Sequence, residues 1–183
     1  RPLRLKRFDG NPILAPNPDN PWEDLAVFNP GAWYDEDRGE VFLLYRSAES
    51  HREYKCYFGL ATSRDGYRFE RVSDRPVLSP SEDGFDASTI QDPRIVKMGD
   101  YFYVTYACRH YPFGQFWKPA EERYTPPERP ADFPCYLRKN ATLTGLLLTK
   151  DFQTWIRAGT MTDPLLDDRD VVLFPERING KYV

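Results

Sequence analysis

Short apolar segments divided by polar turns recur along the chain and predict β-hairpins, because turns rich in Gly, Asn and Asp separate each pair of apolar runs. Three segments share this layout: residues 29–45, 92–106 and 174–183. Their turns fall at residues 35–40, 98–100 and 179–180. A proline stands near the start of each first strand, where a missing N–H donor is tolerated. The pattern predicts three copies of one strand–turn–strand unit.

Two further motifs accompany the hairpins and keep the same order. Residues 59–65 form an apolar strand that ends in an Asp-containing turn, and residues 145–151 repeat this pattern after the second hairpin. Residues 12–16 read Pro-Ile-Leu-Ala-Pro, and residues 76–80 read Pro-Val-Leu-Ser-Pro. The first hairpins and the Pro-rich motifs recur about 63 residues apart. Four strands per repeat at this interval are typical of β-propeller blades with long connections.

We therefore expect an all-β protein with a β-propeller fold, in which residues 1–183 form a single partial domain. The repeats amount to slightly under three blades, whereas a closed propeller needs at least four. The last expected strand is still running at Val183. The sequence thus predicts about three blades of a propeller that is truncated before it closes.

An inserted stretch at residues 109–142 lengthens the interval between the second and third hairpins. It is rich in proline and in aromatic residues, among them Phe113, Phe116 and Trp117. Loops of this length inside a domain are commonly functional lids or contact surfaces. An aromatic lid over a ligand site is one interpretation. A packed loop or a subunit contact is the other, so a homo-oligomer stays open.

Composition and charge exclude several partners and cofactors. A net charge of −3 gives no reason to expect nucleic acid, and no apolar run reaches the roughly 18 residues of a membrane span. The two histidines lack metal-ligand spacing, so we expect no metal and no cofactor. Three scattered cysteines argue against a disulfide framework and fit a reducing compartment. This favours the bacterial cytoplasm; the periplasm is the alternative, since the chain opens at Arg1 and not at Met.

Polar residues open the expected innermost strands, which line the central funnel of a propeller. Asn29, Asp92 and the charged run at residues 167–170 hold comparable places in successive repeats. Burying polar side chains in such strands costs folding stability, so a functional role is one explanation for their presence. The role would be to bind sugar hydroxyls or to transfer protons. The other explanation is that Asn29 and Asp92 form turns before the prolines that follow them.

Three motifs resemble those of glycoside hydrolase family 130. They are Asn29-Pro30-Gly31, the Asp92-Pro93-Arg94 run, and residues 171–182 with their Leu-Phe-Pro core. The run at 149–152 matches the blade pattern of the same family. The resemblance implies a five-bladed propeller and inverting cleavage of β-mannosides. Most members are phosphorylases that release mannose 1-phosphate, and a minority hydrolyse β-1,2-mannosides.

By this resemblance Asp92 is the catalytic acid, which protonates the leaving oxygen through a hydroxyl of the mannosyl ring, and Asn29 contacts mannose. Phosphate is then the co-substrate and nucleophile, and its charge and shape suit clustered basic groups. The phosphate-binding candidates are Arg46, Arg138, Lys139 and Arg169. Each of these could instead form a surface ion pair.

The sugar itself is expected to contact Asn29, Arg46, Tyr103 and Trp117. The two aromatic residues are candidates because the C–H faces of a pyranose ring pack on aromatic rings, although aromatic strand residues are more often part of a core. Two alternatives to a mannoside phosphorylase stay open. Acidic residues at 167, 168 and 170 could activate water in a hydrolase. A non-catalytic propeller that binds glycans is the third interpretation.

Overall fold

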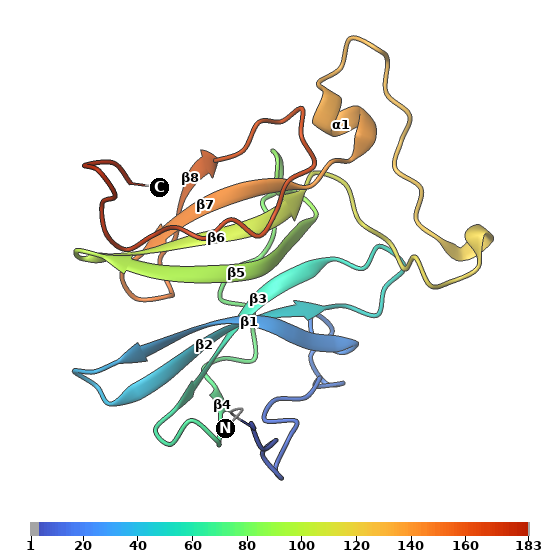
Figure 1. The fold of residues 1–183 in the computed structure, drawn as a ribbon. Helices are drawn as coiled ribbons and strands as arrows, with labels where there is room; N and C mark the ends of the chain where they lie inside the picture. Colours follow the sequence, from blue (N-terminus) through green and yellow to red (C-terminus); the bar gives the residue numbers. More distant parts are fainter. Residues whose placement is uncertain (1–3, 183) are drawn as a thin grey trace.

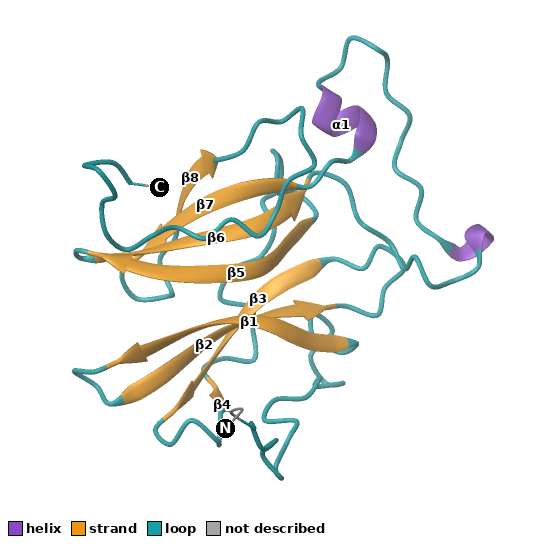
Figure 2. Ribbon diagram, viewed as in Figure 1, coloured by secondary structure: helices purple, strands orange, loops and turns teal. Residues whose placement is uncertain are grey.

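The computed structural model describes residues 4–182, and within them eight strands form two antiparallel four-stranded units (Figure 1). The first unit contains β1 (Ala26–Asp35), β2 (Glu40–Ala48), β3 (Cys56–Ser63) and β4 (Glu70–Arg71). The second contains β5 (Thr89–Met98), β6 (Tyr101–Arg109), β7 (Leu143–Thr149) and β8 (Ile156–Thr160). Each unit pairs its strands in sequence order, as in a propeller blade. The expected all-β class is confirmed (Figure 2).

The two blades pack face to face, and a single parallel bridge between Cys56 and Thr89 joins their edges. Their facing strands contribute one apolar core that includes Leu44, Phe58 and Val104, all fully buried. Phe42 of the first blade stacks on Phe152 of the second at 5.6 Å between ring centroids. This burial of large apolar side chains is the main stabilising contribution between the blades.

A buried carboxylate organises the first blade. Glu23 is fully buried, accepts a hydrogen bond from the Tyr45 hydroxyl at 3.0 Å, and forms an ion pair with Arg71 at 2.9 Å. Arg71 also donates to the carbonyl of Ala15 at 2.5 Å. Glu23, Tyr45 and Arg71, here called the clamp, therefore connect the Pro-rich motif before β1 to the outermost strand. Gly59 leaves space for the Tyr45 ring, because a Cβ at position 59 would lie 2.1 Å from that ring.

The second blade repeats this clamp with different residues. Asp86 accepts from Tyr106 at 2.9 Å and pairs with Arg157 at 2.9 Å, and Arg157 donates to the carbonyl of Ser79 at 2.6 Å. Ser79 occupies the place of Ala15 in the repeated Pro-rich motif. The two motifs that the sequence aligns thus make the same contact in both blades.

The turns that follow β3 and β7 are also equivalent. Asp65 accepts hydrogen bonds from the backbone N–H groups of residues 67 and 68, and Asp151 accepts them from those of residues 153 and 154. Ser63 and Thr149 close each turn through their hydroxyls. The repeat read from the sequence is therefore present at the level of individual hydrogen bonds.

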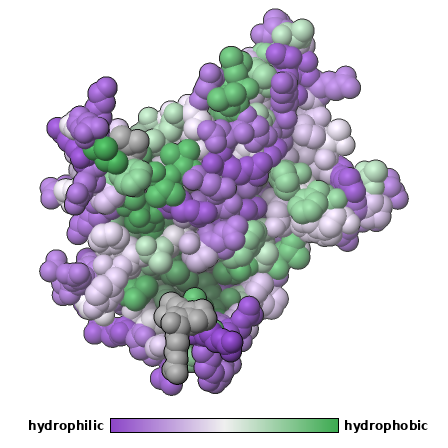
Figure 3. Space-filling model, in the orientation of Figure 1, coloured by the Kyte–Doolittle hydropathy of each residue, from purple (hydrophilic) through white to green (hydrophobic). Residues whose placement is uncertain are grey.

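The third expected hairpin is only partly formed in the described residues. Ile178 and Lys181 pair across the turn at 179–180 by backbone hydrogen bonds of 2.9 and 3.1 Å, but no extended strand flanks them, and Val183 lies outside the described residues. Thr105 of β6 donates to the carbonyl of Val171, so this segment runs across the outer face of the second blade. Hydrophobic side chains are visible along it in Figure 3. A lone hairpin without neighbouring strands is marginal, which explains the difference.

The insertion between β6 and β7 leaves and returns at one point. It contains a 3-10 turn (Ala120–Glu122) and α1 (Cys135–Lys139). Asn140 ends α1 in the left-handed conformation and is buried. Its side chain accepts from the N–H of Tyr111 at 3.1 Å and donates to the carbonyl of Pro112 at 3.2 Å. Arg109 also donates to the carbonyl of Asn140 at 2.7 Å. These hydrogen bonds join the two ends of the insertion, a region here called the neck.

No helix among the described residues is long and apolar enough to cross a membrane.

Candidate functional site

Two β-bulges of the same form lie on the first strands of the two blades. The register of β1 with β2 shifts between Phe28 and Gly31, and that of β5 with β6 shifts between Gln91 and Arg94. Asn29 and Asp92 stand in these bulges with φ of 45° and 52°. Asn and Asp tolerate this left-handed backbone better than most residues, and a bulge releases the following proline from the strand ladder.

The two bulges bring Asn29 and Asp92 together. Asn29 Nδ2 donates to Asp92 Oδ1 at 3.0 Å, and Arg46 Nη1 of β2 donates to the same oxygen at 3.0 Å. Asp92 Oδ2 has no hydrogen-bond partner among the described residues and is not buried. Close approach of β1 and β5 requires Gly31, because a Cβ at that position would lie 2.7 Å from the carbonyl oxygen of Pro93. The site therefore presents a carboxyl group with one oxygen held and one oxygen free.

Arg46 is fixed on three sides. Its guanidinium lies 4.4 Å from the centre of the Phe28 ring and donates to Cys56 Sγ at 3.4 Å as well as to Asp92. The side chain is only 9% exposed, and its Nε has no partner. Burial opposes its charged form, but Cys56 and Asp92 together raise the pKa of Arg46 above the ordinary value. Arg46 is therefore a permanent positive charge beside Asp92.

Arg94 connects the Asp92 bulge to the segment after β8. It donates to the carbonyl oxygens of Asp92 and Pro93, both at 3.2 Å, and pairs with Asp170 at 3.3 Å. The charged run at 167–170 therefore lies beside the bulge, as the comparison of repeats predicts. Two of its acids are already paired, since Asp167 lies 3.6 Å from Arg169.

Arg169 lies close to a second arginine that the sequence reasoning missed. Burial lowers the pKa of Arg109, the charge of Arg169 lowers it further, and Asp167 partly offsets both. Arg109, Arg169 and Asp167 therefore form a group of mixed charge at the base of the insertion. The only signal for Arg109 in the sequence was its place at the end of the second hairpin.

The other two phosphate-binding candidates lie apart from the Asp92 cluster. Arg138 and Lys139 occupy the last turn of α1 and are exposed. Arg138 Nε donates to the carbonyl of Phe133 at 2.9 Å. Within residues 4–182, no hydrogen bond or ion pair joins Arg138 or Lys139 to Asp92, Asn29 or Arg46.

The two expected sugar-contacting aromatic residues differ in their positions. Tyr103 of β6 pairs with Val96 and Leu148 inside the second blade, two residues along β6 from Thr105, the partner of Arg94. Trp117 packs edge-on against Tyr54 at 5.0 Å. Tyr54 is buried beside Cys56 and has a φ of 57°, an uncommon conformation for an aromatic residue. Trp117 is therefore the one that adjoins the site.

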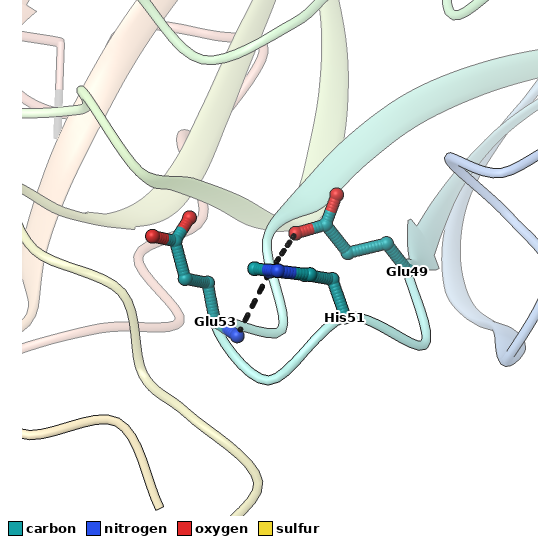
Figure 4. A group of neighbouring side chains, drawn as sticks. All are labelled: Glu49, His51 and Glu53. Carbon is teal, nitrogen blue, oxygen red and sulfur yellow. Dashed lines mark hydrogen bonds and ion pairs between the residues drawn. The ribbon is translucent and has the colours of Figure 1, made fainter.

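Glu49, His51 and Glu53 gather on the loop between β2 and β3 (Figure 4). Glu49 accepts from the Tyr57 hydroxyl at 2.9 Å, and Glu53 pairs with Lys55 at 3.1 Å. His51 lies at the surface, 4.0 Å from Glu49. These contacts within the loop hold the three side chains near one another.

The sequence and the fold both have known relatives. A family model described as beta-1,4-mannooligosaccharide phosphorylase matches residues 4–114, more than half of the chain. A 1,2-beta-oligomannan phosphorylase of Thermoanaerobacter sp. is 34% identical over 99% of this chain and 52% of its own length. A beta-1,4-mannooligosaccharide phosphorylase of Ruminococcus albus is 28% identical over 97% of this chain and 44% of its own. The chain spans about half the length of these relatives.

A solved structure shares the fold. The beta-1,2-mannobiose phosphorylase from Listeria innocua, determined with beta-1,2-mannobiose, superposes with a TM-score of 0.68 at 21% identity. The match covers 96% of this chain and 56% of that one.

Proposed function

Because the chain belongs to glycoside hydrolase family 130, we propose that the protein is an inverting phosphorylase that cleaves β-mannosides with phosphate and releases mannose 1-phosphate. The relatives named as phosphorylases of mannobiose and mannooligosaccharides support this substrate class. The observation that carries the proposal is the meeting of Asn29, Arg46 and Asp92 at two matched bulges.

In this proposal Asp92 is the acid, and its Oδ2 atom delivers the proton. Two donors already occupy Oδ1, so the proton and the substrate have access to the other oxygen. Asp92 delivers the proton to the glycosidic oxygen of the leaving sugar through a hydroxyl of the mannosyl ring. The bond between this oxygen and the anomeric carbon breaks as the oxygen gains the proton. A phosphate oxygen attacks the anomeric carbon from the opposite face, which inverts its configuration.

Phosphate needs positive groups opposite the leaving sugar. Arg169 is proposed to supply one of them; it lies near Arg109, and Asp167, 3.6 Å from Arg169, partly offsets the two positive charges. Arg46 brings a buried charge to the same site, while Arg138 and Lys139 offer exposed charges on the insertion. Asn29, Arg46 and Trp117 are proposed to contact the sugar. Tyr103 has the weakest support of the candidates.

The test uses the complete gene product with β-1,2- and β-1,4-mannobiose, each with and without phosphate. A phosphorylase forms mannose 1-phosphate only when phosphate is present. Free mannose formed at the same rate without phosphate would instead identify a hydrolase, the alternative that the acidic run at 167–170 favours. Binding of mannosides with no product would leave a non-catalytic glycan-binding propeller.

The role of Asp92 is tested separately by Asp92→Asn. Mannose 1-phosphate formation should fall by at least about 100-fold, the usual contribution of a general acid. The matched control is Asp100→Asn on the exposed turn between β5 and β6, which should leave the rate unchanged. More than about a tenth of the activity remaining in Asp92→Asn would exclude Asp92 as the acid.

A further inference from the structure

Three aromatic side chains of the insertion form an exposed row, here called the aromatic row: Phe113, Phe116 and Trp117. Their ring centroids are 5.5 and 5.0 Å apart, and the rings meet edge to face at 71° and 84°. Phe116 is 59% exposed and Trp117 is 48% exposed. Grouped and exposed apolar side chains of this kind commonly mark a binding surface.

The aromatic row is held firmly on the loop between β2 and β3. The buried side chain of Gln115 donates to the carbonyl oxygens of Ser50 and His51 at 2.7 and 3.1 Å. The N–H of Gly114 donates to the carbonyl of Glu53 at 3.0 Å. These hydrogen bonds anchor the residues between the rings, so the row is preorganised and does not wait for a ligand to order it.

Buried side chains link the aromatic row to the candidate site. Trp117 packs on Tyr54, Tyr54 packs beside Cys56, and the Cys56 thiol contacts Arg46. Strand pairing brings the end of β2, the start of β3, the start of β5 and the end of β6 to one end of the blades, since Cys56 pairs with Ala48 and Thr89, and Thr89 with Arg109. A molecule that reaches Asp92 from this end can extend over the row.

We infer that the aromatic row binds the mannosyl units of an oligosaccharide that lie beyond the linkage being cleaved. This inference rests on the proposed function. The C–H faces of successive pyranose rings pack on successive aromatic rings, and Arg109, 4.7 Å from the centre of the Phe113 ring, offers donors to sugar hydroxyls at one end. The surface is small and has charged neighbours in Lys118 and Glu122, which suits a sugar chain better than a protein interface.

The first test compares substrate lengths in the complete gene product. With phosphate present, kcat/KM is measured for a mannobiose and for the mannotetraose of the same linkage. Phe116→Ala and Phe113→Ala should each lower the ratio of tetraose to biose by at least about five-fold. The matched control is Tyr34→Ala at the far end of β1, which is 55% exposed and should leave the ratio unchanged. An unchanged ratio in both row variants would overturn the inference.

The second test measures binding without turnover, so that it is independent of the proposed reaction. Calorimetric titration of mannotetraose in the absence of phosphate should show binding that weakens at least about five-fold in Phe116→Ala. If no mannoside is turned over, the proposed function fails, but this titration still tests whether the aromatic row binds mannotetraose. Absence of tetraose binding to the unmodified protein would overturn the inference. Phe116→Leu, which keeps apolar bulk but removes the ring, replaces Phe116→Ala if that variant does not fold.

Discussion

Asn29 and Asp92 occupy the same place in two successive blades and are joined by a hydrogen bond of 3.0 Å between Asn29 Nδ2 and Asp92 Oδ1. Both stand in bulges before proline, and both have left-handed backbones. One structural position therefore supplies an amide in the first blade and a carboxyl group in the second. The amide holds one oxygen of the carboxyl group and so orients the other.

Asn29→Gly should separate this orienting role from backbone strain, because glycine adopts a φ of 45° freely. A hydrogen bond to a charged group contributes about 1.5–3 kcal/mol, so kcat for mannose 1-phosphate formation should fall roughly 10- to 100-fold. Activity that stays within about two-fold of the original would show that Arg46 alone suffices to hold Asp92.

Arg46→Met should destabilise the protein, because it leaves the carboxylate of Asp92 and the thiol of Cys56 without their shared donor. We expect the free energy of unfolding in urea to fall by about 1–3 kcal/mol, which is below the full cost of a broken buried ion pair because Asp92 is partly exposed. Arg38→Met, which removes an exposed ion pair with Asp35, should change it by less than about 1 kcal/mol. Equal effects of the two substitutions would contradict this prediction.

Asp86→Ala should have a larger effect on stability than any surface substitution. It removes the partner of the buried Tyr106 hydroxyl and of Arg157, so the free energy of unfolding should fall by about 2–4 kcal/mol in urea titrations. Glu23→Ala breaks the equivalent clamp in the first blade and should cost a similar amount. Glu82→Ala, on the exposed part of the same loop as Asp86, serves as the control and should stay within about 0.5 kcal/mol.

Asp151 should contribute to the acid sensitivity of the fold. The backbone N–H groups of Thr154 and Gln153 lower the pKa of Asp151 below its ordinary value of 3.8. The unfolded chain therefore binds this proton more readily than the folded one, and the stabilisation is complete above pH 3.8 and is lost as the pH falls through the lower folded value. Unfolding measured from pH 5 downward should show a shallower loss of stability in Asp151→Asn than in the unmodified protein. If the free energy of unfolding depends on pH in the same way in Asp151→Asn and in the unmodified protein, Asp151 does not contribute to the acid sensitivity.

The sequence was most informative where local chemistry decides the structure. Alternating strands, Asp-containing turns and the paired Asn-Pro and Asp-Pro motifs are local signals, so the blades and the equivalence of Asn29 with Asp92 could be predicted. The third hairpin could be read as a turn but not as strands, because strand formation depends on neighbours outside the segment.

The surroundings of Arg46 could not be predicted in the same way. Phe28 and Cys56 contact it only because β1, β2 and β3 pair in a particular register, and register depends on the packing of whole strands. The clamp arginines were missed for a related reason. Arg71 and Arg157 keep the spacing of the repeated segments at 59–65 and 145–151, but each acts through a buried carboxylate far from it in the sequence, Glu23 or Asp86, and that contact depends on how the strands pack.

The neck formed by Arg109, Asn140 and Tyr111 has an evolutionary consequence. Because the insertion departs from and rejoins the blade at one closed point, residues can be added to it or removed without changing the length of any strand, and the entropic cost of a longer loop is small. Selection can therefore remodel what surrounds the candidate site from outside while the carboxyl group and its two donors stay where the blades hold them.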